Sequence, residues 1–314
     1  MRLYEEAEKI RILGIEGYRF GFFVMLGMAA AAIAIGFLSW AKRYEKGTAP
    51  MLIFLSILFG AAGGRIGFCL MNQELGAMMP LNSWGKITGG GWAMSVVAAG
   101  TMLAGWITAR ITKQKTGRIL DITACALPLF MAMERTGEGC IPDFDYSREL
   151  STEFLKGTFL TFSDDYGSYL ATWKAAGIVM LILFPILIYD IIRSEKDGDT
   201  CVLFLMLFGG CSILLESLRY DRFLSISFVG LEQVLAAVFL GIGVSIAAAH
   251  AGKHQRKAAI TAVISVFVMV GIAVGLEFAL DRTTFNKILI YAIYFLVVAV
   301  PVILGLRLRN KAKI

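Results

Sequence analysis

The sequence predicts an all-α polytopic membrane protein with about nine transmembrane helices. Of the 314 residues, 57% are hydrophobic and 17% are charged, whereas a soluble domain carries about 25% charged residues. The mean hydropathy is +0.70. Apolar segments of about 20 residues, the length that crosses a bilayer as a helix, recur along the chain. We expect spans at 18–40, 50–72, 90–109, 119–135, 175–192, 201–218, 226–249, 258–280 and 287–306.

The loops between these spans alternate in charge, and this pattern predicts orientation. Cytoplasmic loops carry an excess of Lys and Arg. The basic loops follow the first, third, fifth, seventh and ninth spans, with Lys42, Arg43 and Lys46; Arg110, Lys113, Lys115 and Arg118; Arg193 and Lys196; Lys253, Arg256 and Lys257; and Arg307, Arg309, Lys311 and Lys313. We therefore expect an external N-terminus and a cytoplasmic C-terminus. The net charge of +6 then reflects membrane orientation, and no nucleic-acid partner is expected.

Two segments lie outside this pattern. The first twenty residues are polar and of mixed charge, so no cleavable signal is expected there. Residues 136–174 are acidic and aromatic and are too many for a bare loop in a compact protein. We expect them to form a small extracytoplasmic cap with one interfacial helix. The alternative is an extended acidic loop.

Three arginines, Arg65, Arg135 and Arg219, lie in or at the ends of apolar spans. A charge at the centre of a bilayer costs at least about 2.5–3.5 kcal/mol, so such residues are commonly functional. With the predicted orientation, all three lie in the outer half of the membrane, whereas the inner half is nearly free of polar groups apart from Lys and Arg beside loops. The polar residues at the same outer depth are Asn72, Ser95, Glu134, Glu216, Glu232 and Gln233.

A planar guanidinium can bond two oxygens of a phosphate. We therefore interpret this layer as a pocket for the phosphate of an anionic lipid. The alternatives are an arginine that extends to the headgroup region and structural ion pairs between Glu134 and Arg135 or between Glu216 and Arg219.

Cysteine and histidine give no sign of a metal site or of a disulfide framework. The five cysteines have no paired spacing, and the two histidines, His250 and His254, flank one basic loop. We expect neither a metal nor a cofactor.

Four segments of the chain carry an ordered sequence pattern. Residues 63–72, GGRIGFCLMN, resemble the pattern G-x-R-x-G-y-x-x-x-x-N, and residues 90–110 resemble a G-G-x-a-x-H/Y-G-G stretch. Residues 120–139, LDITACALPLFMAMERTGEG, are similar to L-D-x-x-A-P-A-L-P-L-x-x-x-x-G-R-x-G-N. Residues 214–221 and 230–236, LLESLRYD and GLEQVLA, resemble E-x-x-R-x-P-D followed by G-Q-x-x-S. This ordered pattern covers roughly residues 15–245 and resembles that of the prolipoprotein diacylglyceryl transferase family.

The resemblance implies an activity and a topology. Members move the diacylglyceryl group of phosphatidylglycerol onto the thiol of a lipobox cysteine in a preprolipoprotein, in the outer leaflet of the bacterial cytoplasmic membrane. Arg135 and Arg219 correspond to the family's two key arginines. The headgroup-binding residues would be Arg65, Asn72, Ser95, Glu134, Gly137, Glu216 and Gln233. The family pattern has seven spans, so we expect a transferase-like core at 1–249, which includes the cap, and two additional helices at 250–314.

The chain also departs from the family pattern around the arginines. Glu134 replaces a glycine, Glu138 and Asp143 occupy an asparagine and a glutamate position, and Ser95 stands where the family has His or Tyr. Serine is a poor general base. We therefore expect a carboxylate to activate the nucleophile. The candidates are Glu134, Glu138 and Asp143, and Glu138 is the first of them because it lies near Arg135 if the helix continues for one more turn. The alternative is that all three are solvated residues of the cap.

Three functions are consistent with these observations. The first is a lipid-modifying transferase, the second is a lipid- or lipopeptide-binding relative without turnover, and the third is a transporter of an anionic solute. The third is disfavoured because the polar layer is off-centre and no inverted repeat is evident.

Overall fold

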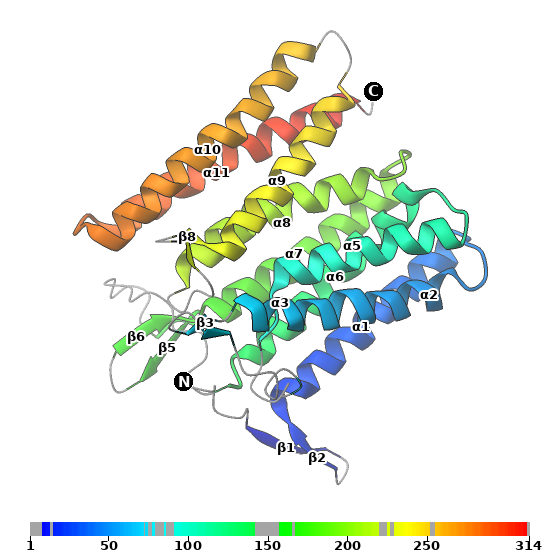
Figure 1. The fold of residues 1–314 in the computed structure, drawn as a ribbon, viewed down its shortest axis with the longest axis horizontal. Coiled ribbons are helices and arrows are strands. Elements are labelled where there is room, and N and C mark those ends of the chain that lie inside the picture. Colours follow the sequence, from blue (N-terminus) through cyan, green and yellow to red (C-terminus); the bar gives the residue numbers. More distant parts are fainter. Residues whose placement is uncertain are drawn as a thin grey trace.

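A computed structural model describes residues 8–12, 15–71, 73–74, 77–78, 85, 91–141, 157–164, 167–219, 225–226, 229–251 and 255–312. Within these residues, nine helical stretches are long and apolar enough to cross a membrane. They lie side by side as one bundle (Figure 1). They are α1 (Arg19–Ala41), α2–η1–α3 (Thr48–Met71), α5 (Met94–Ile111), α6 (Thr116–Glu138), α7 (Thr172–Arg193), α8 (Asp199–Leu218), α9 (Leu231–Ala249), α10 (Arg256–Arg282) and α11 (Lys287–Ala312). The predicted all-α membrane architecture is therefore confirmed, with ends shifted by a few residues.

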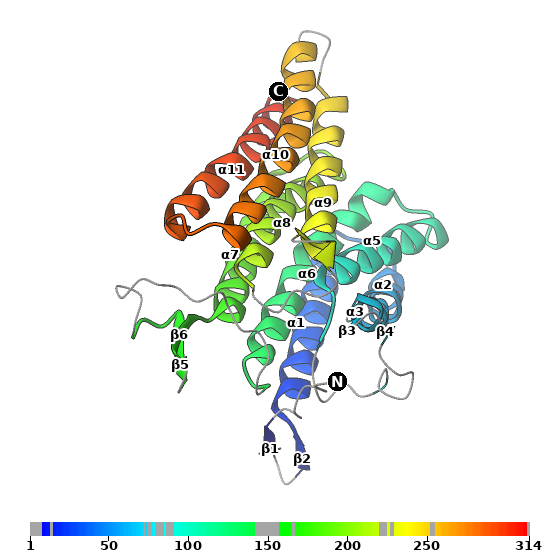
Figure 2. The ribbon, with the colours of Figure 1, turned by 60° about the vertical axis from the view of Figure 1, so that its left-hand side comes forward.

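Short antiparallel hairpins lie toward one end of the bundle (Figures 1 and 2). They are β1 (Lys9–Ile12) with β2 (Ile15–Tyr18), β3 (Gln73–Glu74) with β4 (Ala77–Met78), β5 (Thr161–Asp164) with β6 (Gly167–Leu170), and β7 (Ser225–Ile226) with β8 (Val229–Gly230). The third of these belongs to the predicted cap. Helix α6 ends later and α7 begins earlier than expected, so the connection between them is shorter than 136–174. The described part of the cap, 157–164 and 167–171, contains this hairpin, and the expected interfacial helix stays a prediction. The cap residues 142–156 lie outside the described residues.

Helix α6 occupies the centre of the bundle, where it packs against α1, α5, α7 and α8. About two thirds of its apolar window is buried, compared with about a quarter for α1. A helix surrounded by protein can carry polar residues that would be costly beside lipid. This position explains why α6 contains Asp121, Glu134, Arg135 and Glu138, all of them buried.

Close helix contacts depend on glycine at two crossings. A Cβ atom at Gly100 of α5 would lie 2.0 Å from the backbone oxygen of Phe59, in the π-helical segment η1 (Ser56–Ala62). A Cβ atom at Gly209 of α8 would lie 2.6 Å from the backbone oxygen of Ala236 on α9. Small residues let membrane helices approach backbone to backbone. The segment at the first crossing continues into α3 (Gly63–Met71), which carries Arg65.

The last two helices lie at one side of the bundle (Figure 2). Helix α10 packs mainly against α9 and α11, and α11 also contacts α8. Their buried side chains form a second hydrophobic cluster with residues of α8 and α9, among them Met206, Leu240, Val266 and Tyr294. The helices α8 and α9 therefore join the two parts of the bundle.

Candidate functional site

Two arginines are positioned where α6 and α8 end. Arg135 lies in the last turn of α6, and Arg219 caps α8, with extended backbone angles of φ −75° and ψ 139°. The side chains are only 6% and 4% exposed. Buried charges of this kind require partners, because removing a charge from water costs several kcal/mol per ion.

The partners of Arg135 are carboxylates from two helices. Its Nη1 atom donates to Glu138 Oε1 at 2.6 Å, and its Nη2 atom donates to Glu216 Oε1 at 3.4 Å. Its Nε atom lies 4.0 Å from Glu134 Oε2. The two ends of the guanidinium fork therefore join α6 to α8.

Glu138 links the two arginines. Its second oxygen, Oε2, lies 3.8 Å from Arg219 Nη1, and Glu216 Oε1 lies 3.7 Å from the same nitrogen. The prediction that α6 continues and brings Glu138 to Arg135 is confirmed. Arg135, Arg219, Glu134, Glu138 and Glu216 thus form one group, which we call the arginine cluster.

A fourth carboxylate, Glu232, approaches the cluster from α9. Its Oε2 atom accepts the backbone N–H of Ser95 at 3.0 Å. Ser95 is in the first turn of α5, where backbone N–H groups have no partner within the helix, so Glu232 caps that helix. The electrostatic influence of Glu216 and Arg135 reaches Glu232. Ser95 stands where the family pattern has His or Tyr, and the hydrogen bond described there is donated by its backbone N–H.

Arg65 lies in an aromatic environment. Its Nη1 atom donates to the Gly91 backbone oxygen at 3.1 Å, and its guanidinium lies 5.1 Å from the Phe68 ring centre and 5.8 Å from the Trp92 ring centre. Trp92 stacks on Phe20 of α1 at 5.6 Å. Cations over aromatic faces are stabilised electrostatically.

Gly137 is involved in the packing of α1 against α6. A Cβ atom there would lie about 3.0 Å from the side chains of Phe20 and Phe23. The aromatic pair Trp92–Phe20 therefore stands between Arg65 and this last turn of α6.

Gln233 belongs to a separate hydrogen-bonded group. Its Oε1 atom accepts the N–H of Gly230, and its Nε2 atom donates to Ile213 O at 3.3 Å and to Glu277 Oε1 at 2.8 Å. These described bonds connect α9 with α8 and α10 and involve no arginine. Asn72 and Asp143 lie outside the described residues.

Sequence reasoning missed Glu277, which is buried on α10. The available signal was a single carboxylate in the eighth apolar span. That span was expected to be one of two helices added to the transferase-like core, so its carboxylate was not assigned to the site. Glu232 was recognised as polar at the right depth but was not assigned to the site.

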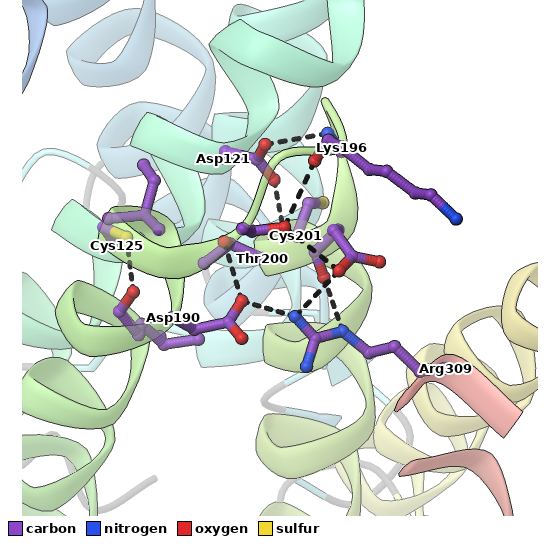
Figure 3. Close-up of polar contacts among 12 residues, drawn as sticks. Asp121, Cys125, Asp190, Lys196, Thr200, Cys201 and Arg309 are labelled. Carbon is purple, nitrogen blue, oxygen red and sulfur yellow. Dashed lines mark hydrogen bonds and ion pairs between the residues drawn. The ribbon is translucent and has the colours of Figure 1, made fainter. Parts of the chain in front are cut away.

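A second buried polar group lies at the opposite end of the bundle from the arginine cluster, where α6 and α8 begin and α7 and α11 end. Figure 3 shows the contacts of this group. Arg309 of α11 bonds Asp190 of α7 and lies 3.1 Å from Asp199 Oδ2 of α8. Asp121 of α6 accepts the backbone N–H groups of Gly198 at 2.7 Å and of Cys201 at 2.8 Å. The expectation that the halves of the spans away from the three arginines are nearly free of polar groups is therefore wrong. The carboxylates are stabilised by the N-terminus of α8 and by an arginine from the end of the chain.

The described His, Cys, Asp and Glu residues form no group of three suited to a metal ion. What the fold positions is a buried set of guanidinium and carboxylate groups at the ends of membrane helices. Such a set can exchange ion pairs with a charged headgroup and can accept a proton. The class of protein is thus a multi-pass membrane protein with a buried cluster of guanidinium and carboxylate groups.

A family model for prolipoprotein diacylglyceryl transferase matches residues 8–249. The chain belongs to this family. It is 24% identical over 213 residues to phosphatidylglycerol–prolipoprotein diacylglyceryl transferase of Staphylococcus aureus (strain Newman), covering 64% of this chain and 74% of that protein. It is 25% identical over 197 residues to the enzyme of the same name from Legionella pneumophila (strain Paris), covering 62% and 76%. The match ends before α10 and α11 begin.

Proposed function

We propose that this protein is a membrane-embedded transferase that moves a diacylglyceryl group from a glycerophospholipid to an acceptor thiol, such as a lipobox cysteine. The observation that supports this proposal is the arginine cluster, in which Arg135 and Arg219 meet across Glu138. The relatives are named for phosphatidylglycerol and prolipoprotein. Phosphatidylglycerol, or a similar anionic lipid, is therefore the first donor to test.

In the proposed reaction, the acceptor sulfur attacks the glycerol carbon that bears the phosphate. A C–S bond forms, the C–O bond breaks, and its electron pair remains on the phosphate oxygen. The guanidinium groups of Arg135 and Arg219 stabilise the charge that develops there, because they are already held in place. The headgroup leaves as glycerol phosphate when the donor is phosphatidylglycerol.

Glu138 accepts the thiol proton in this proposal. In the structure it is bonded to Arg135 and has no exposed surface. A phosphate that takes over the guanidinium would free this carboxylate when substrate arrives. General-base catalysis by such a group contributes about 10²–10⁴-fold in rate.

One observation favours the second candidate, a lipid-binding relative without turnover. The described ion pairs of both arginines are with carboxylates, and Ser95 stands where the family pattern has His or Tyr. A protein of this kind would bind a headgroup and leave its bonds intact.

We also propose that the arginine cluster faces the outer leaflet of a bacterial cytoplasmic membrane, with the N-terminus outside and the C-terminus inside. The ends of α6 and α8 that carry the arginines are opposite to the ends that adjoin the basic loops. In the same proposal, residues 1–249 are the transferase-like core and 250–314 an addition to it.

The test uses purified protein in liposomes that contain labelled phospholipid and a lipobox peptide. Transfer of label to the peptide by the wild type, its loss in Arg135→Ala, and slowed transfer with unchanged lipid binding in Glu138→Gln are the expected results. Lipid binding without any transfer by the wild type would favour the second candidate. Normal turnover by Glu138→Gln would exclude this carboxylate as the base.

A further inference from the structure

The two helices beyond the family match reach the end of the bundle that carries the arginine cluster. The match ends at residue 249, whereas α10 ends at Arg282 and α11 begins at Lys287. At this end Arg219 follows α8, and Glu232 lies in the first turn of α9. Helix α10 packs against α9, and α11 packs against α8 and α9. Side chains of the additional helices can therefore act on the two helix ends that carry these site residues.

Tyr291, in the second turn of α11, caps the end of α8. Its hydroxyl donates to the backbone oxygen of Ser217 at 3.0 Å. Ser217 is fully buried and is one of the last four residues of α8, whose carbonyl groups have no partner within the helix. It stands between Glu216 and Arg219, the two members of the arginine cluster next to this helix end. The hydroxyl therefore holds the backbone from which both side chains project.

Glu277 of α10 acts on the start of α9 through Gln233. Its Oε1 atom accepts the Gln233 amide N–H at 2.8 Å, and the same amide nitrogen donates to the Ile213 backbone oxygen of α8 at 3.3 Å. The amide oxygen in turn accepts the backbone N–H of Gly230, where α9 begins. An amide has a donor end and an acceptor end, so these three bonds fit one orientation of the Gln233 side chain.

This amide is the neighbour of Glu232, which caps α5. Glu232 Oε2 accepts the backbone N–H of Ser95, in the first turn of α5, at 3.0 Å. Successive side chains of a helix project about 100° apart, so Glu232 faces Ser95 only when α9 has the matching rotation about its axis. The bonds of Gln233 to α8 and α10 hold α9 in this rotation.

We propose that Tyr291 and Glu277 are positioning residues for the site, so that α10 and α11 belong to the functional unit. Tyr291 holds the end of α8 with Glu216 and Arg219, and Glu277 holds the rotation of α9 with Glu232. The consequence for transfer rests on the proposed function, whereas the consequence for geometry does not. A displacement of about 1 Å in a catalytic site can cost about 10²-fold in rate.

Four substitutions in the full-length chain test the proposal. Tyr291→Phe removes only the hydroxyl, and Glu277→Met removes the carboxylate at similar length. Glu277→Gln keeps an acceptor oxygen for the Gln233 amide and is the conservative variant. The matched control is Thr283→Val, which removes a hydroxyl that donates to the Ala279 backbone oxygen of its own helix at 2.7 Å, at the same end of the bundle.

The first readout is steady-state label transfer in liposomes with varied donor content. We expect kcat to fall by about 10–10²-fold in Tyr291→Phe and Glu277→Met, with KM near that of the wild type, because a displaced guanidinium no longer matches the charge that develops in the transition state. Glu277→Gln and Thr283→Val should keep most of the wild-type kcat.

The second readout is amide hydrogen exchange, which needs no turnover. The Arg219 N–H bonds the Glu216 backbone oxygen at 3.3 Å, and the Ser95 N–H bonds Glu232. Loss of one supporting hydrogen bond should accelerate local exchange roughly two- to tenfold, at Arg219 in Tyr291→Phe and at Ser95 in Glu277→Met. Thr283→Val should change neither amide.

The results separate this inference from the proposed function. Unchanged exchange at both amides would overturn it, and so would a wild-type kcat in both Tyr291→Phe and Glu277→Met. An equal loss of kcat in Thr283→Val would also overturn it, because the effect would then be a general one. If the wild type transfers no label, the transferase is excluded, and faster exchange at the two amides would still support the positioning of the cluster.

Discussion

Replacing Arg135 tests the reasoning about the site most directly. Arg135→Ala removes both guanidinium bonds, to Glu138 at 2.6 Å and to Glu216 at 3.4 Å. Removing one partner of a buried ion pair lowers the free energy of unfolding by about 3–5 kcal/mol. Losing one donor to a developing negative charge costs about 2.7–4 kcal/mol, or about 10²–10³ in rate. We therefore expect a loss of about 10²–10³-fold in transfer, together with lower stability.

Arg135→Lys separates charge from geometry. The two terminal nitrogens of the arginine contact different carboxylates, one on α6 and one on α8. A single ammonium at the end of a flexible chain lacks this planar fork. The lysine variant should therefore recover part of the stability and little of the activity.

The assay is label transfer in liposomes, with thermal unfolding of each variant in detergent measured in parallel. A double variant, Arg135→Gln with Glu138→Gln, removes both charges of the closest pair and should fold better than Arg135→Ala while staying inactive. If Arg135→Ala turned over lipid at a rate near that of the wild type, Arg135 would have only a structural role, and the mechanism proposed above would be wrong.

Three further predictions concern the fold. Arg309→Ala removes the arginine that pairs with the buried Asp190 and the partly buried Asp199, so it should lower the free energy of unfolding by about 3–5 kcal/mol. The exposed pair Arg282–Asp281 is the control, and a comparable loss in Arg282→Ala would contradict the argument. Gly209→Ala forces the backbones of α8 and α9 apart and should lower the free energy of unfolding by about 1–3 kcal/mol. Gly36→Ala, with no atom within 4 Å of its added Cβ, should not destabilise the protein. Equal melting temperatures of the two variants would refute the close crossing. In a variant without native cysteines, an impermeant maleimide added to intact cells should label Phe159→Cys and spare Glu45→Cys, and the reverse pattern would invert the proposed orientation.

Much of the fold could be predicted because long apolar segments and basic loops are local features of the sequence. Each span follows from about 20 apolar residues in succession. The register of the last turn of α6 could also be anticipated, since three helical residues bring Glu138 beside Arg135. The cap could not be predicted in the same way. Its described hairpin pairs residues such as Phe162 and Tyr169 within a short polar segment. This segment lacks the extended hydrophobic periodicity from which an element can be predicted.

By itself, the sequence determined the class of protein, the nine spans and the arginines in or at the ends of spans, because a charge in an apolar segment is conspicuous. Only the tertiary structure decided which charges meet. Asp190 and Arg309 are 119 residues apart in the chain, and Arg135 and Glu216 are 81 apart, yet each pair is in contact. It also placed Glu232 at the start of α5 and Gln233 against Glu277. Neighbouring side chains of a helix face different directions, so which partner each residue reaches depends on helix rotation and packing.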